Sequence, residues 1–341
     1  MTNLKSLTFQ GLTDLVKRLK WEDYRVKQIF SWIWQKGISD INLMTNLAKP
    51  KREQLQKECY ISALKLSDRK YAQDRAEKFL FTLEDNHNIE SVFIPESTRK
   101  TVCVSTQVGC ALDCKICYTG KMGFTRNLKF YEIADQVLQV QLLTGERISN
   151  VVFMGMGEPF LNYHECLKAI ETINSDFGLN IGARKITVST SGIIERIYDF
   201  ADFPLQAKLA ISLNAANAEL RNELMPINNK YPLKELIKAV KYYVDKKKKR
   251  VTFEYVLIKG INDQPKDVKA LVKLLMGISC KINLIPFNAY PKSKFLSPSI
   301  EEMQEFADKL YPELPAITIR KSRGSEILAA CGQLAGKVSN M

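Results

Sequence analysis

A candidate strand runs directly into a cysteine-rich loop in the stretch Thr101-Val102-Cys103-Val104-Ser105-Thr106-Gln107-Val108-Gly109-Cys110-Ala111-Leu112-Asp113-Cys114-Lys115-Ile116-Cys117. Its first part, Thr101–Gln107, is rich in Val and Thr and predicts a strand. Alternation would place Cys103, Ser105 and Gln107 on one face of that strand. The three cysteines that follow at C-x3-C-x2-C spacing indicate a metal or redox site rather than a disulfide framework.

Strand and helix patterns then alternate along the rest of the chain. Strand patterns cover Thr101–Gln107, Val151–Gly155, Lys185–Thr190, Lys208–Leu213, Val251–Leu257 and Lys281–Pro286. Helix patterns cover Tyr131–Leu143, Tyr163–Asn174, Gly192–Phe200, Pro232–Asp245, Pro265–Met276 and Ile300–Leu310. Six β-then-α units predict an α/β fold with a parallel sheet, a partial (βα)6 relative of the eight-stranded barrel. In such folds the chemistry lies at the carboxyl ends of the strands.

Three regions are expected along the chain. Residues 1–75 show apolar side chains at helical spacing and many Lys and Arg, which predicts a small helical accessory domain. Residues 76–100 contain two strand-like runs, Lys78–Leu83 and Ile89–Ile94, separated by a polar turn, and predict a β-hairpin linker. Residues 101–341 form the predicted core, in which a last strand is expected at Ala316–Arg320.

Composition narrows the classes of partner. The chain has 341 residues and a net charge of +13, which favours contact with a polyanion such as nucleic acid. A basic surface that binds no nucleic acid would give the same net charge, so the net charge alone does not decide whether the protein contacts a polyanion. We find neither an apolar run long enough to span a membrane nor a signal-peptide pattern, and we expect a cytoplasmic protein without membrane contact.

The clustered thiols of Cys110, Cys114 and Cys117 suit two kinds of site. A structural zinc ion normally takes four ligands, and neither histidine of the chain, His87 or His164, lies near the loop in sequence. Three cysteines on a cubane iron–sulfur cluster leave one iron free to bind a small molecule. We favour the cluster. The alternatives are a zinc-stabilised RNA-binding module and a non-catalytic iron–sulfur protein.

A second strand pattern ends in the glycine-rich turn Gly155-Met156-Gly157-Glu158-Pro159. Such a turn lets the backbone approach a ligand closely, although it lacks the third glycine of a dinucleotide site. Polar residues stand at the ends of later strands, where they would face the same pocket, although such residues also occur in ordinary turns. They are Ser189, Ser212, Asn214 and Asn288.

Together these motifs resemble the radical S-adenosylmethionine (SAM) superfamily and, within it, the RlmN family of dual-specificity RNA adenine-C2 methyltransferases. The segments that carry the resemblance are Cys103–Cys110, Gly155–Pro159, Met225–Asn228, Ile285–Asn288 and Ala329–Gly336. It extends from about Tyr24 to Gly336. The near relative is the Cfr family, which methylates C8 of the same rRNA adenine, and Pro159 favours RlmN over Cfr.

The resemblance implies a radical-SAM partial barrel and a role for each matching residue. Cys110, Cys114 and Cys117 would hold a [4Fe-4S] cluster. Cys331 would accept a methyl group from one SAM molecule, a second SAM would supply the radical, Glu90 would accept a proton, and Cys103 would release the product by disulfide formation. The positions that match cofactor contacts are Gly157, Glu158, Ser189, Ser212, Leu213, Asn214 and Asn288.

Two departures from the family pattern are visible. Ile116 stands where the superfamily usually has an aromatic residue, and Asn214 stands where the family usually has His. The remaining cysteines, Cys59, Cys166 and Cys280, have no motif around them and are expected to be structural.

The resemblance also implies partners. They are 23S rRNA and tRNA as substrates, methylated in the peptidyl-transferase centre and 3′ of the anticodon, and a reductant such as flavodoxin or ferredoxin, with the enzyme acting as a monomer. In the helical region we expect phosphate contacts from basic residues. The candidates are Lys5, Lys17, Arg18, Lys20, Arg25 and Lys27. The run Lys246–Arg250 follows a predicted helix end and is interpreted first as a solvated cap.

Overall fold

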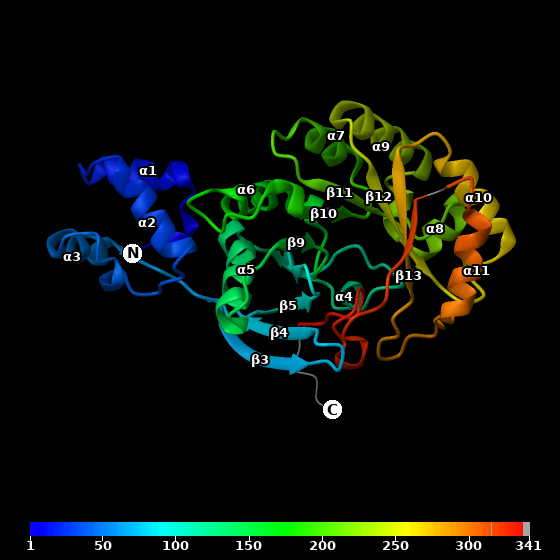
Figure 1. The fold of residues 1–341 in the computed structure, drawn as a ribbon, viewed down its shortest axis with the longest axis horizontal. Helices are drawn as coiled ribbons and strands as arrows, with labels where there is room; N and C mark the ends of the chain where they lie inside the picture. The colour runs from blue at the N-terminus through cyan, green and yellow to red at the C-terminus, as the bar shows by residue number, and fades with distance from the viewer. Residues whose placement is uncertain (315, 337–341) are drawn as a thin grey trace.

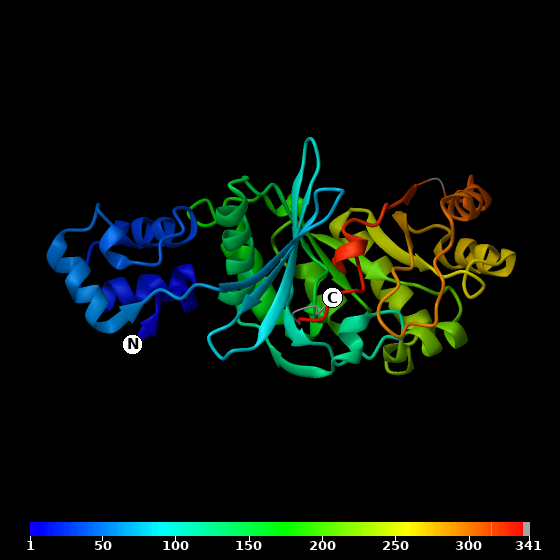
Figure 2. The same cartoon turned by 90° about the horizontal axis from the view of Figure 1, so that it is seen from below.

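The computed structural model describes residues 1–314 and 316–336. Its amino-terminal part is helical, as expected, and lies at one end of an elongated molecule (Figures 1 and 2). The helices are α1 (Phe9–Arg18), α2 (Tyr24–Trp34) and α3 (Lys49–Glu58). Thr8 begins α1 by accepting the Gly11 N–H, which satisfies one of the free donors of the first turn. A short parallel pairing of β1 (Thr2–Asn3) with β2 (Cys59–Tyr60) brings both ends of this helical module together.

One twisted sheet forms the rest of the scaffold. Within the described residues its strand order is β14-β13-β12-β11-β10-β9-β6-β5-β4-β3. The parallel strands are β6 (Lys100–Cys103), β9 (Asn150–Phe153), β10 (Ile186–Thr190), β11 (Lys208–Ser212), β12 (Val251–Leu257), β13 (Cys280–Pro286) and β14 (Ile317–Ile319). Because the order along the sheet follows the order along the chain, each connecting helix returns over the same face, and the predicted α/β architecture is confirmed.

Helices cover the outer face of these strands (Figure 1). They are α5 (Phe130–Thr144), α6 (Tyr163–Asn174), α7 (Ile194–Asp202), α9 (Leu233–Lys247), α10 (Pro265–Leu275) and α11 (Ile300–Leu310). The predicted bounds of α6 and α11 are confirmed to the residue. Two short helices, α4 (Tyr118–Lys121) and α8 (Ala218–Leu224), were not predicted from sequence because neither is long enough to show a helical period.

Three antiparallel strands extend the sheet beyond β6. They are β3 (Lys65–Tyr71), β4 (Glu77–Thr82) and β5 (Asn88–Pro95). The predicted hairpin is present as β4 and β5. β3 was not expected because its charged sequence KLSDRKY lacks an apolar alternation, as suits an exposed sheet edge. β3 pairs with β4 along its length, so the helical module ends before Lys65 rather than at residue 75.

The first core strand is shorter than predicted. β6 ends at Cys103, and the chain then leaves the sheet to form β7 (Gln107–Gly109), which pairs with β8 (Phe124–Asn127) in a separate ribbon. The expected alternation through Ser105 and Gln107 is therefore wrong. The break has a physical cause: the Thr106 and Gln107 N–H groups both donate to the Met156 carbonyl instead of to a sheet partner.

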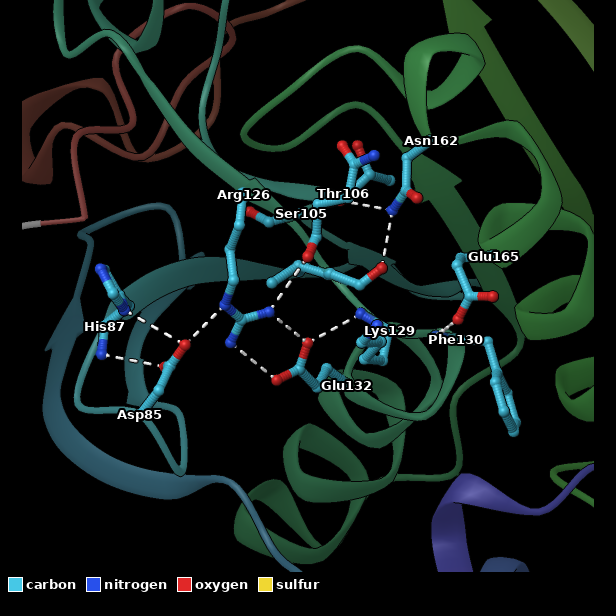
Figure 3. A network of polar contacts seen from close by, with 12 residues as sticks. Asp85, His87, Ser105, Thr106, Arg126, Lys129, Phe130, Glu132, Asn162 and Glu165 are labelled. Carbon is cyan, nitrogen blue, oxygen red and sulfur yellow. Dashed lines mark hydrogen bonds and ion pairs between the residues drawn. The ribbon is translucent and has the colours of Figure 1, made fainter.

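Side chains brace this break from two elements. Asn162 donates to the carbonyls of Thr106 and Leu128 at 2.9 and 2.8 Å (Figure 3). On β8, the Arg126 guanidinium binds Asp85 in the β4–β5 turn at 2.6 Å and both oxygens of Glu132 on α5 (Figure 3).

In the described part of the chain, no helix is long and apolar enough to cross a membrane.

Candidate active site

The carboxyl ends of the parallel strands surround a cavity of about 170 Å³, which we call the first cavity. Ten of its lining residues are positions that the sequence singled out. They are Cys110, Cys114, Cys117, Gly157, Glu158, Ser189, Ser212, Asn214, Asn288 and Cys331. The sheet thus brings together residues that lie far apart in sequence. Leu213, Cys103 and Glu90 do not line this cavity.

The cysteine loop enters the first cavity through a tight turn. Gly109 has a φ of +76°, and a β-carbon there would lie 1.9 Å from the Gly123 carbonyl oxygen, so only glycine fits. The Cys110 N–H donates to that same oxygen at 2.7 Å. Burial raises the pKa of the Cys110 thiol to about 12 and that of Cys114 well above its usual range. The negative charges of the neighbouring thiolates add to the raised pKa of Cys114, so a cation bound among these sulfurs would favour their ionised form.

The lining of the first cavity bears on the two metal hypotheses. A structural zinc ion normally takes four protein ligands. Among the described residues, the lining includes three clustered cysteines and no histidine. In a cubane cluster each cysteine binds a different iron, so three cysteines leave one iron open. Three thiols at one cavity therefore suit an iron–sulfur cluster.

The glycine turn after β9 forms the opposite wall. Gly157 has a φ of +96°, and a β-carbon there would lie 2.5 Å from the Cβ of Gln107. The Gln107 Oε1 accepts the Glu158 N–H at 2.8 Å, which ties this turn to the start of the cysteine loop. The Glu158 carboxylate accepts the N–H groups of Phe160 and Ser191 at 3.0 and 2.8 Å. Burial raises the pKa of Glu158, and these donors act in the opposite direction.

Strand ends supply the remaining polar wall. Ser212 is the last residue of β11, Ser189 is the last but one of the neighbouring strand β10, and their hydroxyls lie 3.4 Å apart. Asn214 adopts a φ of +58°, its Oδ1 accepts the Val256 N–H at 2.9 Å, and its carbonyl accepts the Asn262 side-chain amide at 2.8 Å. Asn214 therefore fastens the end of β11 to the end of β12. Leu213 is fully buried beneath this turn.

Two residues of the site were missed by sequence reasoning. Arg221 is fully buried under the first cavity, where it donates to the carbonyls of Ser191, Ser212 and Leu213. No sequence pattern indicates this contact. Glu254 lies in the buried strand β12 and lines the first cavity; its Oε1 accepts from Asn283, while its Oε2 has no hydrogen-bond partner among the described residues. A carboxylate within the apolar strand VTFEYVL was the signal that could have found it.

A second, smaller cavity of about 50 Å³ adjoins the first. Cys103 lines the second cavity, and Cys331 lines both. The Asn288 side chain also lines both and donates to the Cys331 carbonyl at 3.2 Å. Burial raises the pKa of Cys103 to about 12, with a further contribution from Cys331. Cys331 is exposed as a residue, but the desolvation of its sulfur by surrounding groups raises its pKa, against the opposing influence of the Arg320 guanidinium.

Glu90 on β5 contacts the carboxy-terminal segment that carries Cys331. Its Oε2 accepts the Ala335 N–H at 2.7 Å, and its Oε1 pairs with Lys78 Nζ at 3.1 Å, both side chains being buried. Lys78 also donates to the Leu328 carbonyl at 3.2 Å. A Glu–Lys pair from two neighbouring strands therefore holds the segment on both sides of Cys331. Sequence reasoning missed Lys78, which is one of several lysines with no motif around it.

The basic residues proposed for RNA differ in their surroundings. Lys5 is 1% exposed and pairs with Asp135 on α5 at 2.6 Å, so the prediction that it contacts RNA is wrong. Arg18 is exposed and pairs with Glu58, and Lys51 and Arg25 share Glu22. Lys5 therefore belongs to the buried junction between the helical module and the core and does not lie on the solvent-exposed surface.

Comparison with known proteins gives the family. The model of the radical SAM superfamily matches residues 104–275, and the model of the ribosomal RNA large subunit methyltransferase N-terminal domain matches residues 2–61. A protein of Caldanaerobacter subterraneus subsp. tengcongensis named "Probable dual-specificity RNA methyltransferase RlmN" is 46% identical over 338 residues, covering 99% of this chain and 98% of its own length. A protein of the same name from Bacillus subtilis is 45% identical and covers 96% and 90%.

A solved structure agrees with these sequence relatives. The crystal structure of a radical SAM methyltransferase from Sphaerobacter thermophilus superposes with a TM-score of 0.94 at 41% identity, covering 99% of this chain and all of that one. The similarity includes the helical module, the sheet and the strand ends around the first cavity.

Proposed function

This chain belongs to the RlmN family of radical SAM RNA methyltransferases, and on that premise we propose that it methylates C2 of adenine in 23S rRNA and in tRNA. The sites proposed are the peptidyl-transferase centre and the adenine 3′ of the anticodon. One observation carries the proposal: Cys331 lies where the first cavity meets the second, and Cys103 lies in the second. A methyl group accepted from the first cavity can thus be passed on beside a second thiol.

The residues around the first cavity would bind the cofactors. Cys110, Cys114 and Cys117 would hold a [4Fe-4S] cluster, which when bound supplies the electron that cleaves SAM to a 5′-deoxyadenosyl radical. The SAM positions proposed from sequence are Gly157, Glu158, Ser189, Ser212, Leu213, Asn214 and Asn288. Among the described residues Glu254 Oε2 accepts no hydrogen bond and has only Arg320, at 3.9 Å, as an ionic neighbour, so its carboxylate suits the cationic sulfonium and ammonium groups of SAM. Leu213 would take part through its backbone, because its side chain is buried.

Cys331 would act as the methyl carrier. Its Sγ first accepts a methyl group from one SAM molecule and holds it as a thioether at the boundary of the two cavities. After a second SAM is cleaved, the thioether methyl loses a hydrogen atom and its carbon bonds to C2 of the adenine, so that RNA and Cys331 are joined covalently. This radical route suits C2 because that carbon is electrophilic. It does not react with SAM as a nucleophile would, whereas a carbon-centred radical can add to it.

Release would need a base, a second sulfur and the loss of one electron. The radical adduct would give up one electron to the oxidised cluster, and Glu90 would take the proton lost from C2. The Cys103 thiolate would then attack Cys331 Sγ, forming the disulfide and breaking the bond from Cys331 Sγ to the methylene carbon, which would gain a proton to become the methyl group of the released base. In the structure the Glu90 carboxylate is occupied by Lys78 and the Ala335 N–H. We therefore place proton transfer in a state in which the segment around Ala335 has shifted.

The remaining partners are proposals of the same kind. A flavodoxin or ferredoxin would reduce the cluster and, between turnovers, electrons would also be needed to reduce the Cys103–Cys331 disulfide. The proposed enzyme works as a cytoplasmic monomer, and the helical module helps to hold the RNA through its exposed cations.

Nucleoside mass spectrometry tests the proposal. Anaerobically reconstituted protein, SAM and a chemical reductant are incubated with unmodified rRNA fragment and with tRNA transcript. We expect 2-methyladenosine from the wild type and from the matched control Cys166→Ala, whose buried thiol lines neither cavity, and none from Cys331→Ala. Formation of 8-methyladenosine would place the chain with Cfr, and cofactor cleavage without any methyladenosine would refute the proposed substrate.

The two cysteines can be separated in the same assay. Cys103→Ala should form the bond between Cys331 and adenine but fail to break it, so RNA should remain attached to the protein on a denaturing gel. If Cys103→Ala instead releases methylated RNA at the wild-type rate, Cys103 is not the resolving thiol.

A further inference from the structure

The two adjoining cavities carry opposite charge. Among the described residues, the charged side chains that line the first cavity are Glu158 and Glu254, and no cation lines it. The charged side chains that line the second cavity are Arg320, Lys321 and Arg323, and no carboxylate lines it. A cationic cofactor suits the first cavity, whereas a polyanion suits the second. Cys331 stands at the boundary between them.

The cations of the second cavity come from one short segment, Arg320-Lys321-Ser322-Arg323, which follows β14. Hydrogen bonds fix its backbone at both ends: the Arg320 N–H donates to the Leu284 carbonyl at 2.8 Å, and the Gly324 N–H donates to the Asp74 carboxylate at 3.0 Å. The segment is therefore anchored at both ends and presents four consecutive residues to one cavity, an arrangement that suits a preorganised binding site.

Ser322 gives independent support for a ligand in the second cavity. Its hydroxyl oxygen is shielded from solvent and has no hydrogen-bond partner among the described residues, although it belongs to a side chain that lines the second cavity. A buried hydroxyl without a partner is costly, and an oxygen acceptor would satisfy it. Because the neighbouring side chains are cations, that acceptor is best supplied by an anion.

Arg320, Lys321 and Arg323 make few polar contacts within the protein. Lys321 is exposed and forms no ion pair with a described residue. The guanidinium groups of Arg320 and Arg323 come no closer than 3.9 Å to the carboxylates of Glu254 and Asp74, and one Arg323 nitrogen donates to the Asp74 backbone carbonyl at 3.3 Å. Their guanidinium groups therefore keep donors available for phosphate oxygens, which they can bind through two nitrogens at once.

From this arrangement we propose that Arg320, Lys321, Ser322 and Arg323 hold the backbone phosphate next to the target adenosine in the RNA substrate. The proposal rests on the proposed function for which base is modified, but the phosphate contact itself does not depend on the carbon that is methylated. A phosphate on this segment fixes the nucleotide in the cavity that contains Cys103 and Cys331. The flipped base can then reach Cys331 without meeting the acidic walls of the first cavity.

The test measures binding of an unmodified tRNA transcript as a function of salt concentration. The variant Lys321→Gln/Arg323→Gln is compared with Lys266→Gln/Lys269→Gln, which removes the same charge from the exposed face of α10. We expect the first pair to weaken binding about ten- to a hundredfold at 0.15 M salt and to reduce the slope of log K against log salt by about 1.4, since each lost phosphate contact is worth about 0.7. The second pair should change neither value.

Ser322→Ala and the methylation of Cys331 complete the test. Ser322→Ala should raise KM for RNA with little change in kcat, because it removes one donor from a ground-state contact. Transfer of methyl from SAM to Cys331 without RNA, followed by mass spectrometry of the peptide, should proceed at the wild-type rate in the Lys321→Gln/Arg323→Gln variant. Thermal unfolding of each variant checks that the fold is kept.

Three other results would contradict either the phosphate site or the proposed function. Unchanged affinity and salt slope in Lys321→Gln/Arg323→Gln would overturn the phosphate site. Slow methylation of Cys331 without RNA would also overturn it, because the segment would then serve the thiol. If the wild type binds RNA through these residues but forms no 2-methyladenosine, the proposed function fails while the phosphate site stands.

Discussion

Cys103 is buried in the wall of the second cavity, and this burial controls when it can react. Removal from water disfavours the thiolate and raises its pKa to about 12, and the nearby Cys331 sulfur adds to the shift. Only the thiolate is an effective nucleophile. In the proposed mechanism, this raised pKa would keep Cys103 mostly as an unreactive thiol at neutral pH and would slow disulfide formation with Cys331 before RNA has been modified.

This environment predicts a distinct pH profile for Cys103. With a folded pKa about three units above that of an ordinary thiol, its alkylation by iodoacetamide at pH 7.5 should be roughly a thousandfold slower than in the denatured chain. Its rate should also keep rising with pH beyond 10, because the thiolate is still a minority there. Peptide mass spectrometry measures both; a rate that levels off near pH 8.5 would contradict the prediction.

Residues differ in how far the sequence could place them. The three clustered cysteines, the glycine turn and Cys331 were predicted because each lies in a short motif whose spacing carries the information. Arg221, Lys78 and Ser322 were not predicted, because their importance arises from contacts with residues distant in the chain. Lys5 shows the reverse error: a lysine in a basic helical region was expected at the surface and is instead buried against Asp135.

At the scale of single elements, the strands β4 and β5 serve as an anchor for the segment that carries Cys331. Lys78 and Glu90 lie on these neighbouring strands and bind the Leu328 carbonyl and the Ala335 N–H. Both side chains are buried, so the pair exists without competition from water. Removal of one member leaves the other as an unpaired buried charge, which is the costly arrangement.

Lys78→Met should therefore loosen the segment and destabilise the fold by about 3 kcal/mol. We expect faster hydrogen exchange at the Ala335 amide and at least a tenfold loss of methylation, with partial rescue in Lys78→Arg, which keeps the charge. Lys65→Met, at an exposed position of β3, is the matched control. Wild-type exchange at Ala335 in Lys78→Met would show that the ion pair does not hold the segment.

A second link between elements joins the β4–β5 turn to β8 and α5 (Figure 3). The Arg126 guanidinium lowers the pKa of Asp85 from 3.8 to about 2. A carboxyl group whose pKa is lowered in the folded state stabilises the fold above its ordinary pKa, and this stabilisation is lost as the pH falls through about 2. Asp85 is partly exposed, so the effect is modest.

Asp85→Asn should lower the unfolding free energy by less than about 1 kcal/mol at pH 7. The difference from wild type should shrink between pH 4 and pH 2, where the wild-type carboxylate itself becomes protonated. Thermal unfolding across this range measures the change. A difference that is constant with pH would mean that the carboxylate charge contributes nothing.

Elements also show where local sequence is informative. The predicted bounds of α11 are confirmed to the residue, and its start is marked in the local sequence by Ser299 and Glu302, which form a capping box in the structure. The end of β6 could not be predicted, since residues 104–107 keep a strand-like composition and leave the sheet only because Met156 offers its carbonyl from another loop. The charged strand β3 is defined by pairing with β4 rather than by its own pattern.

Across the whole molecule, the helical module is fixed to the core by a buried ion pair. Lys5 Nζ binds Asp135 on α5, and the same carboxylate accepts the Leu64 N–H at 2.9 Å. One aspartate on the core thus holds both the beginning of the module and the chain that leaves it. This arrangement sets the position of the exposed cations of the module relative to the two cavities.

Lys5→Met should lower the unfolding free energy by about 3 kcal/mol, because Asp135 would remain buried without its cation. The double variant Lys5→Met/Asp135→Leu should recover part of the loss, and Lys17→Met, an exposed change, should have little effect. Urea unfolding provides the comparison. A double variant less stable than either single variant would show that the pair contributes more than charge compensation.

The long-range contact between Thr119 and Leu334 has a consequence for the order in which the enzyme becomes competent. The Thr119 hydroxyl, close to the cysteine loop, donates to a carbonyl 215 positions later in the chain. As the ribosome extends the polypeptide, the loop proposed to hold the cluster emerges long before Cys331, the proposed methyl acceptor, has been made. On this proposal, proteolytic loss of the last segment would return the protein to that earlier condition, with its cluster ligands present and its methyl acceptor missing.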